Sequence, residues 1–110
     1  MSYSLHITCA AERDIDNAAD YIEFVLKNPD AAERLLDAVT EDISSLAMNP
    51  EIYPVVDDSV LRSWGIRFIT IKNYLAFYTI DAKRSTIYIV RFLYSKRDWR
   101  TILKHGIDFS

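Results

Sequence analysis

Three segments decide the fold of this chain: IRFITI (66–71), YLAFYTI (74–80) and TIYIVRFLY (86–94). They are rich in Ile, Val, Phe, Tyr and Thr, the residues that suit a pleated, half-buried surface. Lys72-Asn73 is a tight break between the first two segments, and the polar run 81–85 separates the second from the third. Strands joined by such short breaks pair as an antiparallel meander.

Two amphipathic segments precede the meander. Residues 10–27 and 29–48 each carry apolar side chains at helical spacing. Thr8 and Asn28 are suited to cap the two helices, and Pro29 fits the first helical position of the second. The short connection predicts an antiparallel hairpin packed by its two stripes. The first stripe is Ile15, Ala18, Ala19, Ile22, Val25 and Leu26, and the second is Ala32, Leu35, Leu36, Val39, Ile43, Leu46 and Ala47.

The remaining segments complete the prediction. Tyr3–Thr8 alternates as a short strand, residues 49–65 read as an irregular crossing, and Asp98–Lys104 is a short closing helix. We therefore predict an α+β fold in one domain, residues 1–110. It has an N-terminal strand, a helical hairpin, a three-stranded antiparallel meander and a short C-terminal helix, with the helices packed on one sheet face.

Composition excludes several classes of protein. The chain has no apolar run near the ~18 residues of a membrane span, and its N-terminus lacks the pattern of a signal peptide. Cys9 is the only cysteine, which favours a reducing cytoplasm. His6 and His105 are too far apart in sequence to suggest a zinc site with it. We expect no metal and no cofactor.

Charge is segregated along the sequence. Residues 1–58 carry thirteen acidic side chains against three basic ones, and residues 59–110 carry ten basic against three acidic. The halves have net charges of −10 and +7, which together give the −3 of the whole chain. If the second half forms one surface, that surface attracts polyanions or an acidic partner segment.

Arg91 is the only charged residue in its strand, and it allows two interpretations. A guanidinium is costly to bury alone, so it must pair with a carboxylate or face a polar groove. One interpretation is a structural ion pair, for example with an acid of the second helix. The other places Arg91 on the floor of a groove on the sheet face opposite the helices.

Basic and aromatic residues of the second half are the candidate site. Lys96, Arg97 and Arg100 directly follow the last strand, where they suit phosphates or carboxylates. With neighbouring tyrosines they also suit nucleic acid, although a solvated turn and ordinary packing are alternatives. A nuclease needs a general base and acid, and the segment offers few beyond Tyr94 as a proton relay. We find no paired carboxylates, Ser/His/Asp set or phosphate loop.

The stretch GIRFITIKNYLAFYTID (65–81), followed by TIYIVRFLYSKRDW (86–99), resembles the RelE/ParE superfamily of bacterial toxins. The helical hairpin matches as well. The resemblance implies a plasmid-stabilisation type of growth inhibitor encoded beside an antitoxin. An acidic C-terminal segment of that antitoxin wraps the toxin, and operator DNA is bound only through the antitoxin.

Two branches of this superfamily differ in their target. In the ribonuclease branch, basic residues of the sheet hold messenger RNA on the ribosome, and Arg97 matches one of its arginines. Leu75 stands where that branch often has an arginine, and Leu103 where it often has a tyrosine. These departures favour the ParE-like branch, which inhibits DNA gyrase without cutting RNA.

Three hypotheses follow from the sequence. The first is a gyrase inhibitor of the ParE type with no nuclease activity. The second is a ribosome-dependent mRNA endoribonuclease, with Arg97, Tyr94 and Arg91 as candidate catalytic residues. The third is a non-toxic homologue that only binds its antitoxin. The candidate antitoxin- or target-binding residues are Arg67, Lys72, Arg91, Tyr94, Lys96, Arg97 and Arg100.

Overall fold

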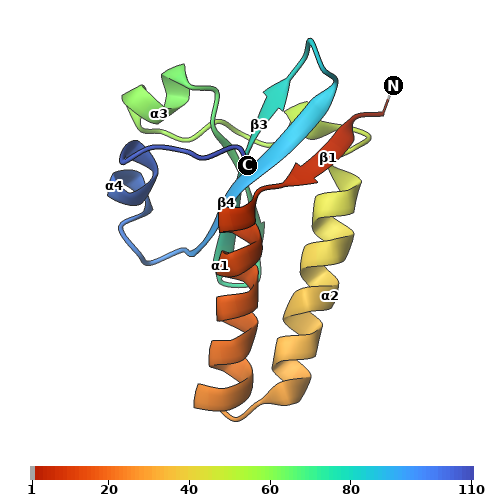
Figure 1. Cartoon of the computed structure of the whole chain (residues 1–110), viewed down its shortest axis with the longest axis vertical. Helices are drawn as coiled ribbons and strands as arrows, with labels where there is room; N and C mark the ends of the chain where they lie inside the picture. Colours follow the sequence, from red (N-terminus) through yellow and green to blue (C-terminus); the bar gives the residue numbers. More distant parts are fainter. Residues whose placement is uncertain (1) are drawn as a thin grey trace.

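A four-stranded sheet organises the molecule (Figure 1). The structure is a computed structural model that describes residues 2–110. The strands are β1 (Ser4–Ile7), β2 (Arg67–Ile71), β3 (Tyr74–Asp81) and β4 (Thr86–Tyr94), in the spatial order β1-β4-β3-β2. The predicted meander is confirmed, since β2, β3 and β4 pair antiparallel. The N-terminal strand joins it as a fourth strand, parallel to β4.

The helical hairpin also matches the prediction. α1 (Cys9–Asp20) and α2 (Pro29–Ser45) are capped as expected, because the side chains of Thr8 and Asn28 accept hydrogen bonds from Ala11 N–H and Ala31 N–H. Thr8 is fully buried, and its hydroxyl also lies within 3.0 Å of the Ile89 carbonyl oxygen. This residue therefore fixes the start of α1 to the middle of β4.

The end of the first helix differs from the prediction. After Asp20 the chain continues as a π-helix, η1 (Tyr21–Val25), in which Leu26 N–H donates to the Tyr21 carbonyl at 3.0 Å. The wider turn rotates the following side chains off the stripe. Val25 and Leu26, expected in the core, are 63% and 56% exposed. Leu36 of α2 is likewise 40% exposed.

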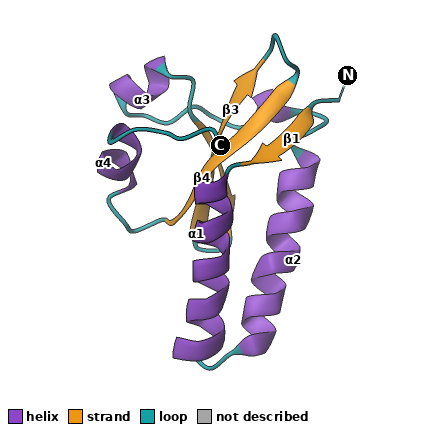
Figure 2. Ribbon diagram, in the orientation of Figure 1, coloured by secondary structure: helices purple, strands orange, loops and turns teal. Residues whose placement is uncertain are grey.

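Both faces of the sheet are covered. The hairpin packs on one face, with Leu35, Val39 and Ile43 of α2 against Ile69, Tyr78 and Ile89 of the sheet. On the other face Phe77, Val90 and Leu93 pack against Leu61 and Leu103. These last two belong to α3 (Ser59–Ser63) and α4 (Trp99–Lys104), which lie on the other side of the strands from α2 (Figure 2). The alternative in which the sheet face opposite the hairpin is an open groove with Arg91 on its floor is therefore wrong.

The crossing segment contains short helices that sequence patterns did not reveal. η2 (Pro50–Ile52) is a 3-10 turn, held by the Tyr78 hydroxyl, which donates to the Pro50 carbonyl at 2.5 Å. α3 is capped by the Asp58 carboxylate and ends at Ser63, and Gly65, two residues further on, has a φ of +73°. Five-residue helices carry too little periodicity to be read from sequence. This segment supplies the layer that closes the second face.

The segregated charges meet in the folded chain. Three ion pairs join an acid of the first half to a base of the second: Asp14–Arg91, Asp57–Arg100 and Asp58–Lys104, at 2.6, 2.7 and 2.6 Å. Opposite charges in the two halves therefore serve partly to hold those halves together. The basic half is not one uninterrupted docking surface.

Candidate partner-binding groove

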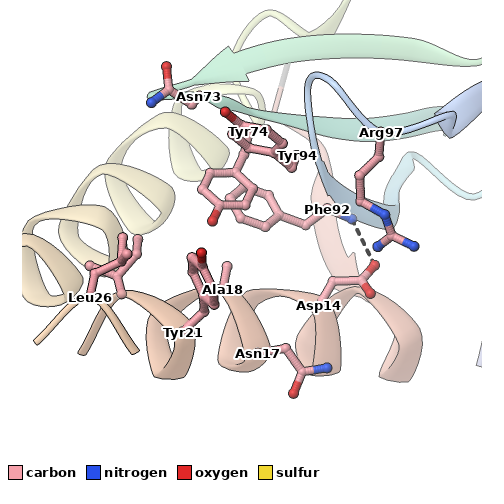
Figure 3. A pocket seen from close by; sticks show the side chains of 11 residues that line it. Asp14, Asn17, Ala18, Tyr21, Leu26, Asn73, Tyr74, Phe92, Tyr94 and Arg97 are labelled. Carbon is pink, nitrogen blue, oxygen red and sulfur yellow. Dashed lines mark hydrogen bonds between the residues drawn. The ribbon is translucent and has the colours of Figure 1, made fainter. Parts of the chain in front are cut away.

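A groove opens between the first helix of the hairpin and the part of the sheet where β3 begins and β4 ends (Figure 3). Its volume is about 660 Å³. One wall comes from α1 and η1 and the other from β3, β4 and the segment that follows β4. It is lined by Asp14, Asn17, Ala18, Tyr21, Ile22, Leu26, Asn73, Tyr74, Phe92, Tyr94 and Arg97.

Aromatic rings form the sheet side of the groove. Tyr74 stacks on Phe92, with ring centroids 4.9 Å apart and planes at 11°, and meets Tyr94 edge to face at 5.6 Å. Burial raises the pKa of the Tyr74 phenol, with smaller contributions from Tyr94 and Tyr21. Tyr94 is 38% exposed and Tyr21, across the groove, is 51% exposed. Such amphipathic rings suit a partner that has both apolar and hydrogen-bonding groups.

A carboxylate and two guanidinium groups define the charged end of the groove. Asp14 accepts hydrogen bonds from Arg91 Nε at 2.6 Å and Nη2 at 3.0 Å, and from Phe92 N–H at 3.0 Å. The side chain of Arg97 extends toward this end in Figure 3. Within residues 2–110, none of the ion pairs involves Arg97. Arg97 is exposed, so its guanidinium is available to an incoming carboxylate or phosphate.

The topology explains the position of Asp14. β1 pairs with β4 only as far as Ile89, and the chain then turns into α1. The next part of the β4 edge has no strand beside it, and the Asp14 carboxylate binds the Phe92 N–H there. At the same place Val90 forms a bulge in the register between β3 and β4. The predicted structural ion pair of Arg91 is thus present, with an acid of the first helix rather than the second.

The other candidate residues are distributed over the molecule. Arg67 donates to the carbonyl of Tyr53, which belongs to the crossing segment (49–65), at 2.6 Å. Arg100 pairs with Asp57 and lies over the Trp99 ring, 4.2 Å from its centroid. Neither lines the groove. These two arginines support the local structure, and the structure does not bring them together with Arg97.

Lys72 and Lys96 are exposed beside the groove. Lys72 lies in the β2–β3 turn with a φ of 56°, next to Asn73, which lines the groove. Lys96 stands between Tyr94 and Arg97 in the chain. Of the seven candidates, Tyr94 and Arg97 therefore line the groove directly, and these two lysines flank it in sequence.

Sequence reasoning missed the hairpin side of the groove. Asp14, Asn17 and Tyr21 fall three or four residues apart, so they share a face of a helix. That spacing is visible in the sequence, but nothing in it shows that this face meets the end of β4. The parallel pairing of β1 with β4 creates the contact.

The titratable side chains that line the groove are the Asp14 carboxylate, the phenols of Tyr21, Tyr74 and Tyr94, and the Arg97 guanidinium. Its carboxylate, Asp14, is engaged by Arg91 and Phe92, and neither histidine lines the groove. Among residues 2–110 no group of three His, Cys, Asp or Glu side chains is placed to hold a metal ion. No helix in the same range has the length and apolarity to cross a membrane.

Comparisons with known proteins define the class. Residues 5–99 match the family described as the ParE toxin of the type II toxin–antitoxin system parDE. The chain therefore belongs to the ParE toxin family. A search of curated protein sequences finds no significant match.

Two solved structures share its fold. The toxin–antitoxin complex RelBE2 of Mycobacterium tuberculosis superposes with a TM-score of 0.62 at 23% identity, covering 86% of this chain and 99% of that one. The chromosomal ParDE toxin–antitoxin system of P. aeruginosa superposes with a TM-score of 0.70 at 22% identity. The match covers 86% of this chain and 98% of that one. The predicted resemblance to the RelE/ParE superfamily is confirmed.

Proposed function

We propose that this chain is a toxin that a cognate antitoxin neutralises by laying an acidic, partly apolar segment in the groove. Arg97 receives a carboxylate of that segment, and Tyr74, Tyr94 and Tyr21 receive its apolar side chains. The observation that carries this proposal is the combination of an aromatic groove with an exposed guanidinium at one end. The ParDE and RelBE2 structures of similar fold are complexes with antitoxins, which supports a partner of this kind.

For the cellular target we propose DNA gyrase, inhibited by protein contact without nuclease activity. Two features weigh against the endoribonuclease alternative and so favour this choice. Arg91, a candidate catalytic residue, has its guanidinium committed to Asp14. Arg67, which the endoribonuclease hypothesis uses to hold RNA together with Arg91, Lys96 and Arg97, donates to the Tyr53 carbonyl instead. Messenger RNA gains affinity from several phosphate contacts. Of the arginines in the RNA-holding set, Arg97 lines the groove, with Lys72 and Lys96 exposed beside it.

The second candidate function is a ribosome-dependent mRNA endoribonuclease. The exposed Tyr94 ring beside Arg97 favours it, because a base stacks on a tyrosine while a guanidinium holds its phosphate. The third is a homologue that binds its antitoxin without toxicity.

One experiment separates the three. The chain is expressed from a tightly controlled promoter, with and without the product of the adjacent antitoxin gene. The gyrase proposal predicts growth arrest, cell elongation, a DNA-damage response and loss of supercoiling by purified gyrase, with intact messages. Cleavage of messages at codons supports the endoribonuclease instead. Normal growth supports the non-toxic homologue. Arrest that the antitoxin fails to relieve contradicts the proposed neutralisation.

A further inference from the structure

The tip of the hairpin exposes a run of apolar side chains that the groove does not account for. Phe24, Val25 and Leu26 are consecutive, and their exposed fractions are 66%, 63% and 56%. Leu26 lines the groove, whereas Phe24 and Val25 are not among its lining residues. Figure 1 shows this turn at the lower end of the hairpin, at the greatest distance from β1 and the N-terminus.

The exposure results from local backbone geometry. An α-helix continued through this segment would have kept Val25 on the buried stripe with Ile15, Ala18 and Ile22. The π-helix takes Val25 off that stripe and leaves it 63% exposed, and none of the π-helix residues is buried. Lys27 then adopts a left-handed φ of 54° to reverse the chain. π-helical turns are rare and occur frequently at functional sites.

Acidic side chains outnumber basic ones in the part of the hairpin that carries the apolar tip. From residue 16 to residue 37 the hairpin carries six acids and two bases, a net charge of −4. The acids are Asp16, Asp20, Glu23, Asp30, Glu33 and Asp37, and the bases are Lys27 and Arg34. An anionic bilayer repels such a tip, and so does a second copy approaching tip to tip. A protein surface with an apolar pocket and a rim of lysines or arginines is complementary to it.

We propose that Phe24 and Val25 form a docking point, separate from the groove, for a basic-rimmed apolar pocket on the protein that the toxin inhibits. This inference rests on the proposed function, and it names the surface that contacts the target. The antitoxin and the target then use different primary contacts: the groove with Arg97 for one, and the apolar tip with its acidic rim for the other.

The test is a separation of functions. The double variant Phe24→Ser/Val25→Ser is compared with the control Met48→Ser. Met48 is an apolar residue of similar exposure (70%) that follows the C-terminal end of α2, away from the tip. Growth arrest, inhibition of purified gyrase and affinity for the antitoxin are measured for both. We expect the double variant to lose growth arrest and to inhibit gyrase at least tenfold less, with antitoxin affinity within twofold of the parent. Met48→Ser is expected to match the parent throughout. Asp20→Lys is expected to weaken gyrase inhibition at least threefold, because it reverses one charge of the rim.

Several results would overturn the inference. One is a double variant that still arrests growth, and another is a parallel loss of antitoxin affinity, which assigns the tip to the antitoxin. A third is a concentration-dependent dimer of the parent that the double variant abolishes, which makes a second copy the occupant. If the parent arrests growth but leaves gyrase active, the gyrase proposal fails. The role of the tip is then decided by growth alone: loss of growth arrest in the double variant supports it, and continued arrest contradicts it. If the parent does not arrest growth, both proposals fail.

Discussion

The carboxylate of Asp14 holds the guanidinium of Arg91 by two hydrogen bonds, of 2.6 and 3.0 Å, across 77 residues of sequence. The same carboxylate accepts the Phe92 N–H at the edge of β4, where β1 has ended. The Asp14 side chain thus accepts a backbone hydrogen bond at a strand edge that has no neighbouring strand, and it neutralises the half-buried Arg91. It joins the first helix to the last strand and forms the charged end of the groove.

Loss of Asp14 is therefore expected to destabilise the fold. Asp14→Ala leaves Arg91 without its partner and Phe92 N–H without an acceptor, at a cost of about 2–3 kcal/mol in the free energy of unfolding. Asp14→Asn keeps an acceptor and loses the charge, so its cost is smaller. Urea unfolding followed by circular dichroism measures both. The control is Asp16→Ala, an exposed position on the same helix, with an expected change below about 0.5 kcal/mol. Equal stability of Asp14→Ala and Asp16→Ala would contradict the account of this contact.

Tyr78 makes stability depend on alkaline pH. Burial raises the pKa of its phenol to about 12, against the ordinary value of 10.0. Between pH 10 and 12 the folded chain keeps the phenol proton of Tyr78 and the unfolded chain loses it. The free energy of unfolding is therefore unaffected below pH 10 and falls as the pH rises toward 12. A shift of this size corresponds to about 2–3 kcal/mol. Tyr78→Phe lowers stability at pH 7, because the bond to Pro50 is lost, and removes much of the decline above pH 10. Denaturant midpoints from pH 7 to 11.5 test this. Identical pH profiles for parent and variant would show that another group governs alkaline unfolding.

Asp58 connects the two short helices that cover the second sheet face. Its carboxylate binds Lys104 of α4 and caps α3 through Leu61 and Val60 N–H. The hydrogen bond from Lys104 is the largest cause of a lowered pKa for this carboxyl, followed by that from Leu61. A lowered pKa means that the stabilisation is present above the ordinary Asp pKa and is lost as pH falls through the folded value. We expect the Asp58 carboxyl to titrate below that ordinary pKa in carbon-detected NMR, and Lys104→Met to move it upward. Titration at the same pH in both proteins would remove Lys104 from the explanation.

The sequence predicted what local chemistry determines. The strands, both helix caps and the hairpin follow from β-branched runs, Thr8 and Asn28, each of which acts within a few residues. The pairing of Asp14 with Arg91 depends on the parallel contact of β1 with β4, which no local pattern encodes. Local patterns therefore left open whether Arg91 forms an ion pair or faces a groove as Arg97 does. In the structure the first is in an ion pair and the second lines the groove.

The exposed hairpin tip was mispredicted for a different reason. Helical spacing assigns Val25 to the core only if the α-helix continues, and the backbone changes to a π-helix at Tyr21. Places where consistent local rules fail are expected at functional sites. This is why the tip, rather than the groove alone, is a candidate contact for the target.

The affinity of the antitoxin for Arg97→Glu tests the central claim most directly. The purified antitoxin is titrated calorimetrically into the parent, into Arg97→Glu, and into Lys83→Glu, an equal change of charge in the β3–β4 turn outside the groove. The groove account predicts at least a tenfold loss of affinity for Arg97→Glu, about 1.4 kcal/mol or more, and a change below threefold for Lys83→Glu. Equal affinities of Arg97→Glu and the parent would contradict it.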